Sequence, residues 1–257
     1  MTERPGAVHH FAARGFDVAG EVYERGRPSY PQAAVDLLIA ELGIGPGRDV
    51  LDLAAGTGKL TRLLAPAGAR LVAVEPVAGM RRVLAGVMPG LRILDGVAEA
   101  IPLPDGALDA VVVGQAFHWF DAPAALAEIA RVLRPGGRLG LVWNSRDESE
   151  PWVARLSALL DRHAGDAPRH RDLAWRPALA ASPRFGPLTE RAFRHDHAGT
   201  AATHRDRVAS VSFIACLAPP ERAAFLDEVT ALLTRHADPD GLVMPYRTTV
   251  FWTALRA

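Results

Sequence analysis

The central part of the chain alternates short apolar runs with longer stretches in which apolar residues recur at helical spacing. The apolar runs predict strands at Asp49–Leu53, Leu71–Glu75, Leu91–Leu94, Leu108–Gly114 and Arg138–Trp143. The stretches between them predict helices, one marked by Leu60, Leu63 and Leu64 and another by Leu126, Ile129, Val132 and Leu133. Strands that alternate with helices are typical of a parallel sheet built from βαβ units.

Further elements are expected on both sides of this core. The pattern predicts helices over Pro31–Leu42, Pro151–His163 and Glu221–Leu233, and β-branched and aromatic residues predict a closing strand over Tyr246–Ala254. Residues 1–30 and 167–187 show little periodicity. No stretch resembling a linker divides the chain, so we expect a single domain over residues 1–257.

Composition then excludes several classes of protein. The 257 residues are 49% hydrophobic and 23% charged, which is typical of a soluble globular domain. A net charge of +0 gives no field that would draw the chain to nucleic acid or to an anionic membrane. The sequence has no run of 18 apolar residues, no secretory signal near Met1 and a single cysteine, Cys216. We therefore expect a cytoplasmic protein with neither a nucleic acid nor a membrane partner.

A glycine turn follows the first core strand and opens a helix, in the segment Val50–Thr61. In doubly wound sheets such a turn borders the ligand crevice, where backbone N–H groups approach an anionic group. A phosphate loop would need glycine in place of Leu53 and a hydroxyl in place of Leu60, and a dinucleotide turn would need glycine in place of Thr61. The remaining candidate is S-adenosylmethionine, whose single carboxylate needs less charge neutralisation. Lys59 is therefore interpreted as a surface residue of the helix's first turn.

Glu75 ends the second predicted strand 23 residues after Asp52. This offset is close to the roughly 20 residues at which an acid reaches a ribose in this topology. Its two carboxylate oxygens suffice for both ribose hydroxyls. The alternative is a solvent-facing acid at a strand end.

Several motifs occur in a fixed order along the chain: Val22–Pro31, Asp52–Thr61, Val72–Pro76, Ala98–Pro104, Gln115–Phe120 and Arg131–Gly137. With these motifs the chain resembles class I S-adenosylmethionine-dependent methyltransferases, in the trans-aconitate methyltransferase-like branch that acts on small molecules. The resemblance implies an α/β fold, a three-layer Rossmann-like sandwich whose seven-stranded sheet is mostly parallel with an antiparallel last strand. It also implies an N-terminal cap (1–45), a cofactor-binding core (46–145) and a C-terminal elaboration with substrate-side elements (146–257).

The resemblance assigns cofactor contacts motif by motif. The glycine turn would line the methionine part of S-adenosylmethionine. The end of the second strand would contact the ribose, and the segment after the third strand would contact the adenine. Tyr23 and Arg27 would cover the cofactor as a lid, or else be a packed tyrosine and a surface arginine. Two positions depart from many relatives, since Ala54 replaces a glycine and Val97 an aspartate. The predicted set is Tyr23, Arg27, Asp52, Ala54, Gly56, Gly58, Glu75, Pro76, Val97, Ala98, Glu99 and Gln115.

Candidate acceptor-binding residues follow the fourth and fifth strands. His118 is the candidate catalytic base, because a hydroxyl or amine acceptor must lose a proton. Alternatively, His118 forms a wall of the acceptor pocket or is a packing residue. Arg146 together with Arg247 would suit a carboxylate acceptor. The predicted substrate-side residues are Phe117, His118, Trp119, Trp143, Asn144 and Arg146.

Sequence alone thus predicts methyl transfer from S-adenosylmethionine to a small-molecule acceptor, by a monomer or homodimer. His195 and His197 would share one strand face, which we interpret as solvated because no third metal ligand is evident; no metal is expected. Two alternatives stay open. One is an NAD(P)-dependent oxidoreductase, and the other is a non-catalytic binding protein that keeps the methyltransferase fold.

Overall fold

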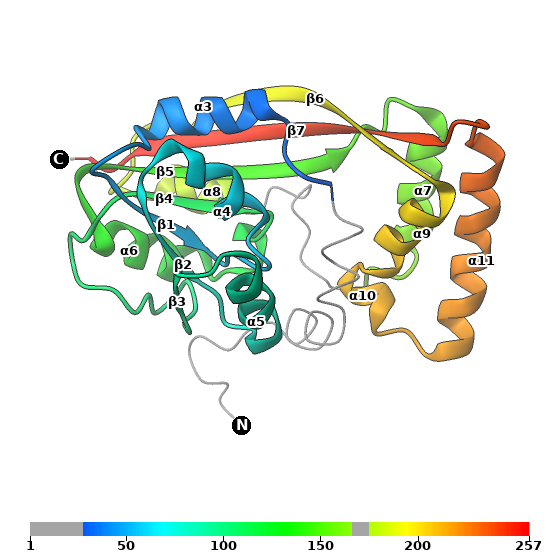
Figure 1. The fold of residues 1–257 in the computed structure, drawn as a ribbon, viewed down its shortest axis with the longest axis horizontal. Helices are drawn as coiled ribbons and strands as arrows, with labels where there is room; N and C mark the ends of the chain where they lie inside the picture. Colours follow the sequence, from blue (N-terminus) through cyan, green and yellow to red (C-terminus); the bar gives the residue numbers. More distant parts are fainter. Residues whose placement is uncertain (1–27, 166–174, 257) are drawn as a thin grey trace.

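A single twisted sheet organises the protein in the computed structural model, which describes residues 28–165 and 175–256 (Figure 1). The strand order is β3-β2-β1-β4-β5-β7-β6, and β7 alone runs against its neighbours. This confirms the predicted seven-stranded, mostly parallel sheet with an antiparallel last strand. The strands are β1 (Asp49–Leu53), β2 (Arg70–Val74), β3 (Arg92–Leu94), β4 (Leu108–Gly114), β5 (Leu133–Arg146), β6 (Thr189–Gly199) and β7 (Leu242–Ala254).

Helices cover both faces of the sheet and complete three layers. The apolar side chains of α3 (Gln32–Leu42) and α4 (Lys59–Leu64) pack on one face with Val50, Val112 and Val250. Those of α6 (Ala122–Val132) and α8 (Trp175–Ala181) pack on the other face with Leu51, Val111 and Leu139. Alternating strand residues therefore supply two separate cores, as a sheet covered on both faces requires. The remaining core elements are α5 (Ala78–Val87), η1 (Ala65–Ala67) and η2 (Phe117–Trp119).

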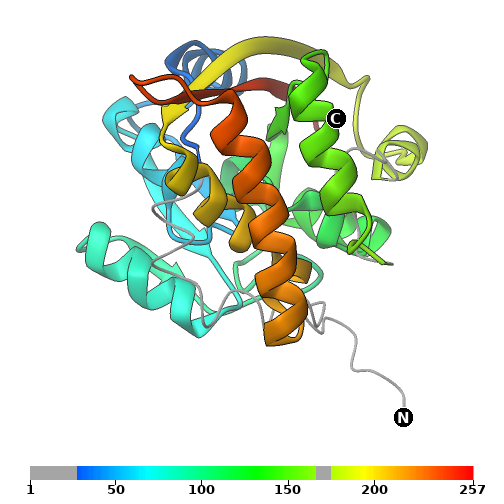
Figure 2. The same cartoon turned by 90° about the vertical axis from the view of Figure 1, so that its right-hand side faces the viewer.

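Four helices form a separate lobe beyond the carboxyl ends of β1 and β4 (Figures 1 and 2). They share a third apolar cluster with the first residues of β7, in which Phe225, Val229 and Leu233 meet Met244 and Tyr246. The long strands β5, β6 and β7 extend beyond the other strands of the sheet and connect it to this lobe. Its helices are α7 (Pro151–Asp161), α9 (Ala201–Ala209), α10 (Ser212–Ala215) and α11 (Pro219–His236).

The main differences from the predicted elements lie in the last strands. The sequence predicted a strand at His195 and His197 but not the extent of β6, whose residues alternate between exposed and half-buried and include few aliphatic side chains. The expectation that these two histidines lie on a solvated strand face is wrong, because both are half-buried.

The sequence predicted only the middle of β5, which begins five residues earlier at Leu133 with an irregular register against Leu108 and Ala110. Leu133, predicted to belong to the preceding helix, is the first residue of β5, and Pro135 and Gly136 lie inside the irregularity. The helices α5, α8, α9 and α10 were also not predicted.

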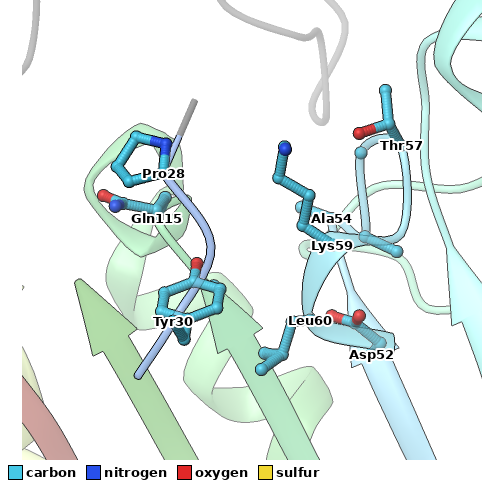
Figure 3. A pocket seen from close by; sticks show the side chains of 11 residues that line it. Pro28, Tyr30, Asp52, Ala54, Thr57, Lys59, Leu60 and Gln115 are labelled. Carbon is cyan, nitrogen blue, oxygen red and sulfur yellow. The ribbon is translucent and has the colours of Figure 1, made fainter. Parts of the chain in front are cut away.

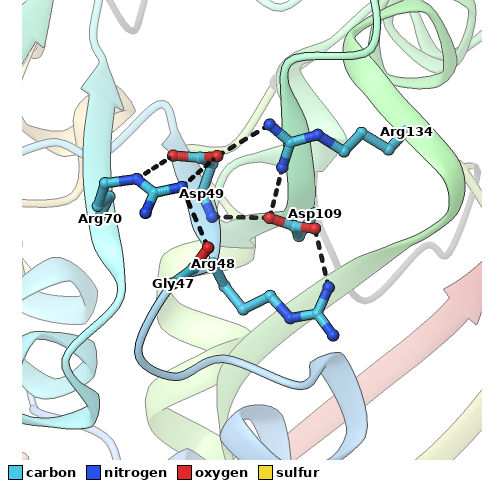
Figure 4. Close-up of polar contacts among 6 residues, drawn as sticks. All are labelled: Gly47, Arg48, Asp49, Arg70, Asp109 and Arg134. Carbon is cyan, nitrogen blue, oxygen red and sulfur yellow. Dashed lines mark hydrogen bonds and ion pairs between the residues drawn. The ribbon is translucent and has the colours of Figure 1, made fainter.

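An ion-pair network occupies the amino-terminal edge of the sheet (Figure 4). Asp49 accepts hydrogen bonds from Arg70 at 2.6 Å and from Arg134 at 2.9 Å. Asp109 accepts from Arg134, from Arg48 and from the backbone N–H of Asp49, the last at 2.8 Å. The network thereby ties β1, β2, β4 and the start of β5 together at one edge.

Candidate active site

A pocket opens at the carboxyl ends of β1 and β4, between the glycine turn and the segment that leads into α3 (Figure 3). Figure 3 shows Pro28, Tyr30 and Gln115 on one side of it, with Ala54 and Lys59 across the gap. This is the edge at which open α/β sheets bind ligands. The lining residues are Pro28, Tyr30, Asp52, Ala54, Ala55, Gly56, Thr57, Lys59, Leu60, Gly114 and Gln115.

Strained backbone marks the two strand ends that form the pocket. Ala54 has a φ of 57° and Gln115 a φ of 61°, and within the described residues no other non-glycine residue has a positive φ. Each follows directly after its strand, β1 or β4. A side chain in this left-handed region costs about 1 kcal/mol, and such strain tends to gather at functional sites. A glycine at this φ would not carry this cost.

Glu75 lies behind the glycine turn and holds it in place. One carboxylate oxygen accepts the N–H of Gly56 at 2.8 Å, and the other accepts the N–H of Val77 at 2.9 Å. The side chain is buried, and burial raises its pKa against the lowering effect of these two hydrogen bonds. Each oxygen has lone pairs left for a further donor, which suits the two hydroxyls of a ribose. Glu75 is therefore not the solvent-facing acid of the alternative interpretation.

Asp52 sits at the base of the pocket. Its carboxylate accepts a hydrogen bond from the Thr61 hydroxyl at 2.6 Å. Burial, with the nearby charge of Glu75 as a smaller cause, raises the pKa of Asp52 to about 7. Two buried carboxyl groups therefore lie beside the glycine turn, and such perturbed groups in a cleft are typical of functional sites.

The glycines near the pocket serve different purposes. Gly56 lines the pocket and has a φ of 58°, a conformation that favours glycine. A Cβ on Gly58 would lie 2.3 Å from Leu84 of α5, so this glycine is needed for helix packing. A Cβ on Gly114 would lie 2.7 Å from the Tyr30 hydroxyl, so Gly114 allows Tyr30 to reach the pocket.

The residues predicted around the adenine lie beyond the end of β3, outside the pocket lining. Val97 and Glu99 are half-buried, and Ala98 belongs to the apolar core. The Glu99 carboxylate accepts the N–H of Asp121 at 2.8 Å, so it supports the start of α6. Pro76 is half-buried between Glu75 and Val77. Their contact with a cofactor stays a prediction.

His118 lies on η2 directly after β4, half-buried between two tryptophans. The indole N–H of Trp143 donates to Nδ1 of His118 over a long 3.4 Å, and the Trp119 ring lies 5.0 Å away. Because an indole can only donate, neutral His118 carries its proton on Nε2. That nitrogen then donates a hydrogen bond and cannot accept a proton. The geometry favours the pocket-wall interpretation over the base.

Phe117 and Trp143 belong to an aromatic core. Phe117 is fully buried, Trp143 is almost so, and Trp175 contacts both rings. Their contact with an acceptor would need this core to open. The half-buried Trp119 stays nearer the surface.

Asn144 and Arg146, both predicted to border the acceptor, are engaged within the fold. Asn144 donates to the Ser29 carbonyl at 2.9 Å and accepts from Thr248 at 2.6 Å, so it anchors the segment that carries Pro28 and Tyr30. Arg146 donates to the buried Ser157 of α7 at 3.1 Å.

The expected pairing of Arg146 with Arg247 on one carboxylate is wrong. Arg146 pairs with Tyr246 across the ladder, and Arg247 pairs with Ser145 and Arg194. Directly opposed residues share a face, so the two arginines point to opposite faces of the sheet.

The predicted site residues do not include seven of the lining residues: Pro28, Tyr30, Ala55, Thr57, Lys59, Leu60 and Gly114. Lys59 was taken as a surface residue, but Figure 3 shows its amine rising into the pocket. Its place at the first turn of a helix that follows a glycine turn was the available signal. Tyr23 and Arg27 lie outside the described residues.

Comparison with known proteins agrees with this geometry. A family model described as "Methyltransferase domain" matches residues 51–141, which includes the glycine turn and β4. This fold and this match are those of class I methyltransferases. The uncharacterized methyltransferase Rv3342 of Mycobacterium tuberculosis is 44% identical over 238 residues, covering 91% of this chain and 92% of its own length. The chain therefore belongs to the methyltransferase family.

More distant comparisons extend the same result. The uncharacterized methyltransferase-like protein C25B8.10 of Schizosaccharomyces pombe is 37% identical, over 89% of this chain and 91% of its own length. A solved structure from Anaeromyxobacter dehalogenans, described as a candidate type II methyltransferase, has a TM-score of 0.69 at 25% identity, covering 90% and 97% of the two chains. The [4+2]-cyclase SpnF has the same fold, with a TM-score of 0.60 at 16% identity over 100% of both chains.

Proposed function

We propose that this protein transfers a methyl group from S-adenosylmethionine to a small-molecule acceptor. The observation that carries the proposal is the pocket beside the glycine turn, with the Gly56 N–H bonded to the buried Glu75 at the end of β2. A buried carboxylate with acceptor capacity suits the ribose of a nucleoside cofactor. A solved geranyl diphosphate methyltransferase with the same fold, at 17% identity and a TM-score of 0.50, is described in complex with sinefungin.

The chain's own residues would divide the work of binding and orientation. Glu75 would accept the ribose hydroxyls, and the strained turn at Ala54 and Gly56 would face the methionine part. Gln115 and Tyr30 would flank the reactive end from the opposite wall. S-adenosylmethionine supplies an activated methyl group on a sulfonium, so the protein's contribution is mainly to hold the acceptor in line and exclude water. We include Pro76, Val97, Ala98 and Glu99 as the adenine side of the same proposal, with Tyr23 and Arg27 as its cover.

His118 is proposed as an acceptor-binding residue that donates through Nε2. Trp143 holds the required tautomer by donating to Nδ1. Trp119, beside His118, would form the outer wall, with Phe117 and Trp143 supporting it from the core and Asn144 and Arg146 fixing the neighbouring strand.

We propose small-molecule chemistry in a single domain, in the cytoplasm. Balanced charge gives no broad field for a polymeric acceptor. None of the helices in the described ranges is both long and apolar enough to pass through a lipid bilayer. Within the same ranges, no three histidine, cysteine, aspartate or glutamate side chains are grouped to hold a metal ion.

Calorimetry tests the cofactor, and mass spectrometry tests the reaction. We expect S-adenosylhomocysteine to bind with a micromolar Kd and NADH to show no binding. Tight NADH binding without S-adenosylhomocysteine binding would favour the oxidoreductase alternative. Incubation of a cell extract with methyl-labelled cofactor should then yield a labelled product. Cofactor binding with no labelled product would favour the non-catalytic alternative. The solved structure of SpnF is an example of this fold in a protein described as a [4+2]-cyclase and not as a methyltransferase.

A further inference from the structure

A second cavity lies at the amino-terminal edge of the sheet, at the opposite end of β1 and β4 from the proposed cofactor pocket. It is lined by the end of α3 and the loop that follows, by Asp109 of β4 and by residues 134–138 of β5. Its volume is about 250 Å³, and it shares no lining residue with the cofactor pocket. Clefts for drug-sized ligands measure roughly 300 to 1,000 Å³, so this cavity suits a smaller molecule. We call it the bulge cavity.

An irregular pairing of β5 with β4 accounts for this cavity. Between two paired positions β4 has a single residue, Asp109, where β5 has four, residues 134–137. All four line the cavity. A Cβ on Gly137 would lie 2.9 Å from the Arg134 carbonyl oxygen, so the bulged backbone requires this glycine. Bulges often re-aim side chains next to functional sites, and this one places arginines around an opening.

Three arginines from different segments line the bulge cavity. Arg48 directly precedes β1, Arg134 begins the bulge, and Arg138 directly follows it. Asp109 accepts from Arg48 at 3.0 Å and from Arg134 at 2.6 Å, so these two guanidinium groups lie on either side of one carboxylate (Figure 4). Arg138 donates to the Glu41 carbonyl and has no carboxylate partner in the described part of the chain. Three arginines against one aspartate give the lining a net charge of +2.

These arginines keep donors that the fold does not use. A guanidinium has five N–H donors, and hydrogen bonds within the described residues use one from Arg48, two from Arg134 and one from Arg138. The side chains of Arg48 and Arg134 are 58% and 40% exposed, so a ligand can reach them. Asp49, the second partner of Arg134, is itself paired with Arg70. The cavity therefore offers both positive charge and hydrogen-bond donors to an anion.

We propose that the bulge cavity binds a phosphate group, free or carried by a small phosphate ester. A phosphate monoester has a charge of about −1.5 to −2 at pH 7, which matches the net charge of the lining. Its three terminal oxygens point in different directions and can accept from arginines of different segments. The two oxygens of a carboxylate lie in one plane and suit a single guanidinium.

The rest of the lining fits a short ester, because Ala40 and Leu42 offer apolar surface to a few carbon atoms. A bound phosphate would join the loop before β1 to both ends of the bulge, and a ligand that binds only the folded state stabilises it. This site is independent of the proposed methyl transfer.

Amide NMR of the nitrogen-15-labelled full chain tests the proposal and locates the site. Four probes are titrated at constant ionic strength: glycerol 3-phosphate, inorganic phosphate, succinate and glycerol. We expect both phosphates to shift the resonances of Gly136 and Gly137 with a Kd below about 1 mM. Succinate also carries two negative charges, and we expect it to bind at least roughly ten times more weakly, with no binding of glycerol.

Each outcome of these titrations has a definite meaning. Tighter binding of glycerol 3-phosphate would assign the bulge cavity to a phosphorylated metabolite, and tighter binding of inorganic phosphate would assign it to the free ion. Succinate or glycerol binding as tight as that of the phosphates would overturn the proposal. The absence of a saturable shift at Gly136 and Gly137 would overturn it as well.

A matched pair of variants separates binding in the cavity from general attraction to an arginine-rich surface. Arg138→Gln keeps a donor for the Glu41 carbonyl but removes one positive charge from the lining, so we expect glycerol 3-phosphate to bind roughly ten times more weakly. Arg70→Gln removes the same charge from the same edge, but Arg70 does not line the cavity, so we expect a loss of less than about threefold. Equal losses would overturn the proposal. Arg138→Gln should bind S-adenosylhomocysteine as the unmodified protein does, and absent S-adenosylhomocysteine binding by the unmodified protein would contradict the proposed function alone.

Discussion

Two aspartates of β1 stand three residues apart in opposite electrostatic states. At the amino end, hydrogen bonds from Arg70, with Arg134 also contributing, lower the pKa of Asp49 to about 2. Toward the carboxyl end, burial raises the pKa of Asp52 to about 7. One strand therefore has a carboxylate stabilised by cations at one end and a carboxyl destabilised by burial at the other. The backbone follows the same division, since both strained non-glycine residues lie at the carboxyl edge.

The difference shows how the fold separates stability from binding. At the amino edge every carboxylate has an arginine partner, and the pairs join four strands. At the carboxyl edge, Asp52 accepts a hydrogen bond from the Thr61 hydroxyl, and Glu75 accepts hydrogen bonds from the main-chain N–H groups of Gly56 and Val77. Groups held in a costly state keep free acceptor capacity for a ligand. Changes at the carboxyl edge should therefore affect binding, and changes at the amino edge should affect stability.

The largest expected effect is on cofactor affinity. Glu75→Gln replaces one acceptor oxygen with an NH2 group that faces the N–H of Gly56 or Val77. Losing a charge-assisted hydrogen bond costs about 2 to 3 kcal/mol, so we expect the Kd for S-adenosylhomocysteine to rise by roughly 30- to 150-fold. Calorimetry measures this directly, with the exposed Asp95→Asn as a control of unchanged affinity. A Glu75→Gln variant that is folded and binds normally would remove Glu75 from the site.

At the amino edge, Asp109→Ala should lower stability and leave binding unchanged. It removes the acceptor of the partly buried Asp49 N–H and one partner of Arg134. An unsatisfied buried donor costs about 2 kcal/mol in the free energy of unfolding, measured by urea denaturation. Arg48→Ala serves as the control, because an exposed ion pair should contribute under about 0.5 kcal/mol. Weaker S-adenosylhomocysteine binding by Asp109→Ala would show that the two edges are coupled.

The sequence predicted the bounds of strands that alternate cleanly with helices more accurately than the bounds of the last three strands. The bounds of β1 and β4 were correct, because each is a short apolar run between polar turns. The extent of β6 was not predicted because its exposed charged residues alternate with half-buried histidines and give no aliphatic signal. The position of Glu75 followed from its spacing to Asp52.

Side-chain roles that depend on long-range register could not be predicted. The opposite orientations of Arg146 and Arg247 follow from the pairing of β5 with β7, about a hundred residues apart along the chain. The tautomer of His118 follows from Trp143, on another strand. Lys59 enters the pocket because the turn before α4 places its first residue there. Each role depends on contacts between distant segments, which spacing along the chain does not specify.

The pH dependence of stability should differ in sign between Asp52 and Asp49. A folded-state pKa of about 7 for Asp52, above the ordinary 3.8, means that its contribution to stability is full below pH 4 and is lost as pH rises toward 7. For Asp49, lowered to about 2, the contribution is present above pH 4 and is lost as pH falls toward 2.

Asp52→Asn therefore tests the carboxyl edge, since it keeps an acceptor oxygen for Thr61 and removes the titration. We expect the variant to gain stability over the unmodified protein as pH rises from 5 to 8, reaching about 1 to 2 kcal/mol. Urea denaturation across that range measures the difference, with Asp36→Asn on the outer side of α3 as a control. A constant difference at every pH would mean that Asp52 is ionised throughout.

The smallest expected effect concerns the strain itself, at Ala54. Because Ala54 has a φ of 57°, the substitution Ala54→Gly removes about 1 kcal/mol of steric cost from the folded state. Glycine also makes the unfolded chain more flexible, which offsets roughly 0.4 to 1 kcal/mol of that gain. The net change in the free energy of unfolding should thus be a stabilisation of at most about 0.5 kcal/mol. Gly106→Ala provides the reverse comparison: its φ is 59° and no atom lies within 4 Å of an added Cβ. That substitution should destabilise the protein by up to about 0.5 kcal/mol. Changes of opposite sign in the free energy of unfolding of the two variants would separate backbone strain from packing. Changes of the same sign would mean that neighbouring residues relieve the strain at Ala54.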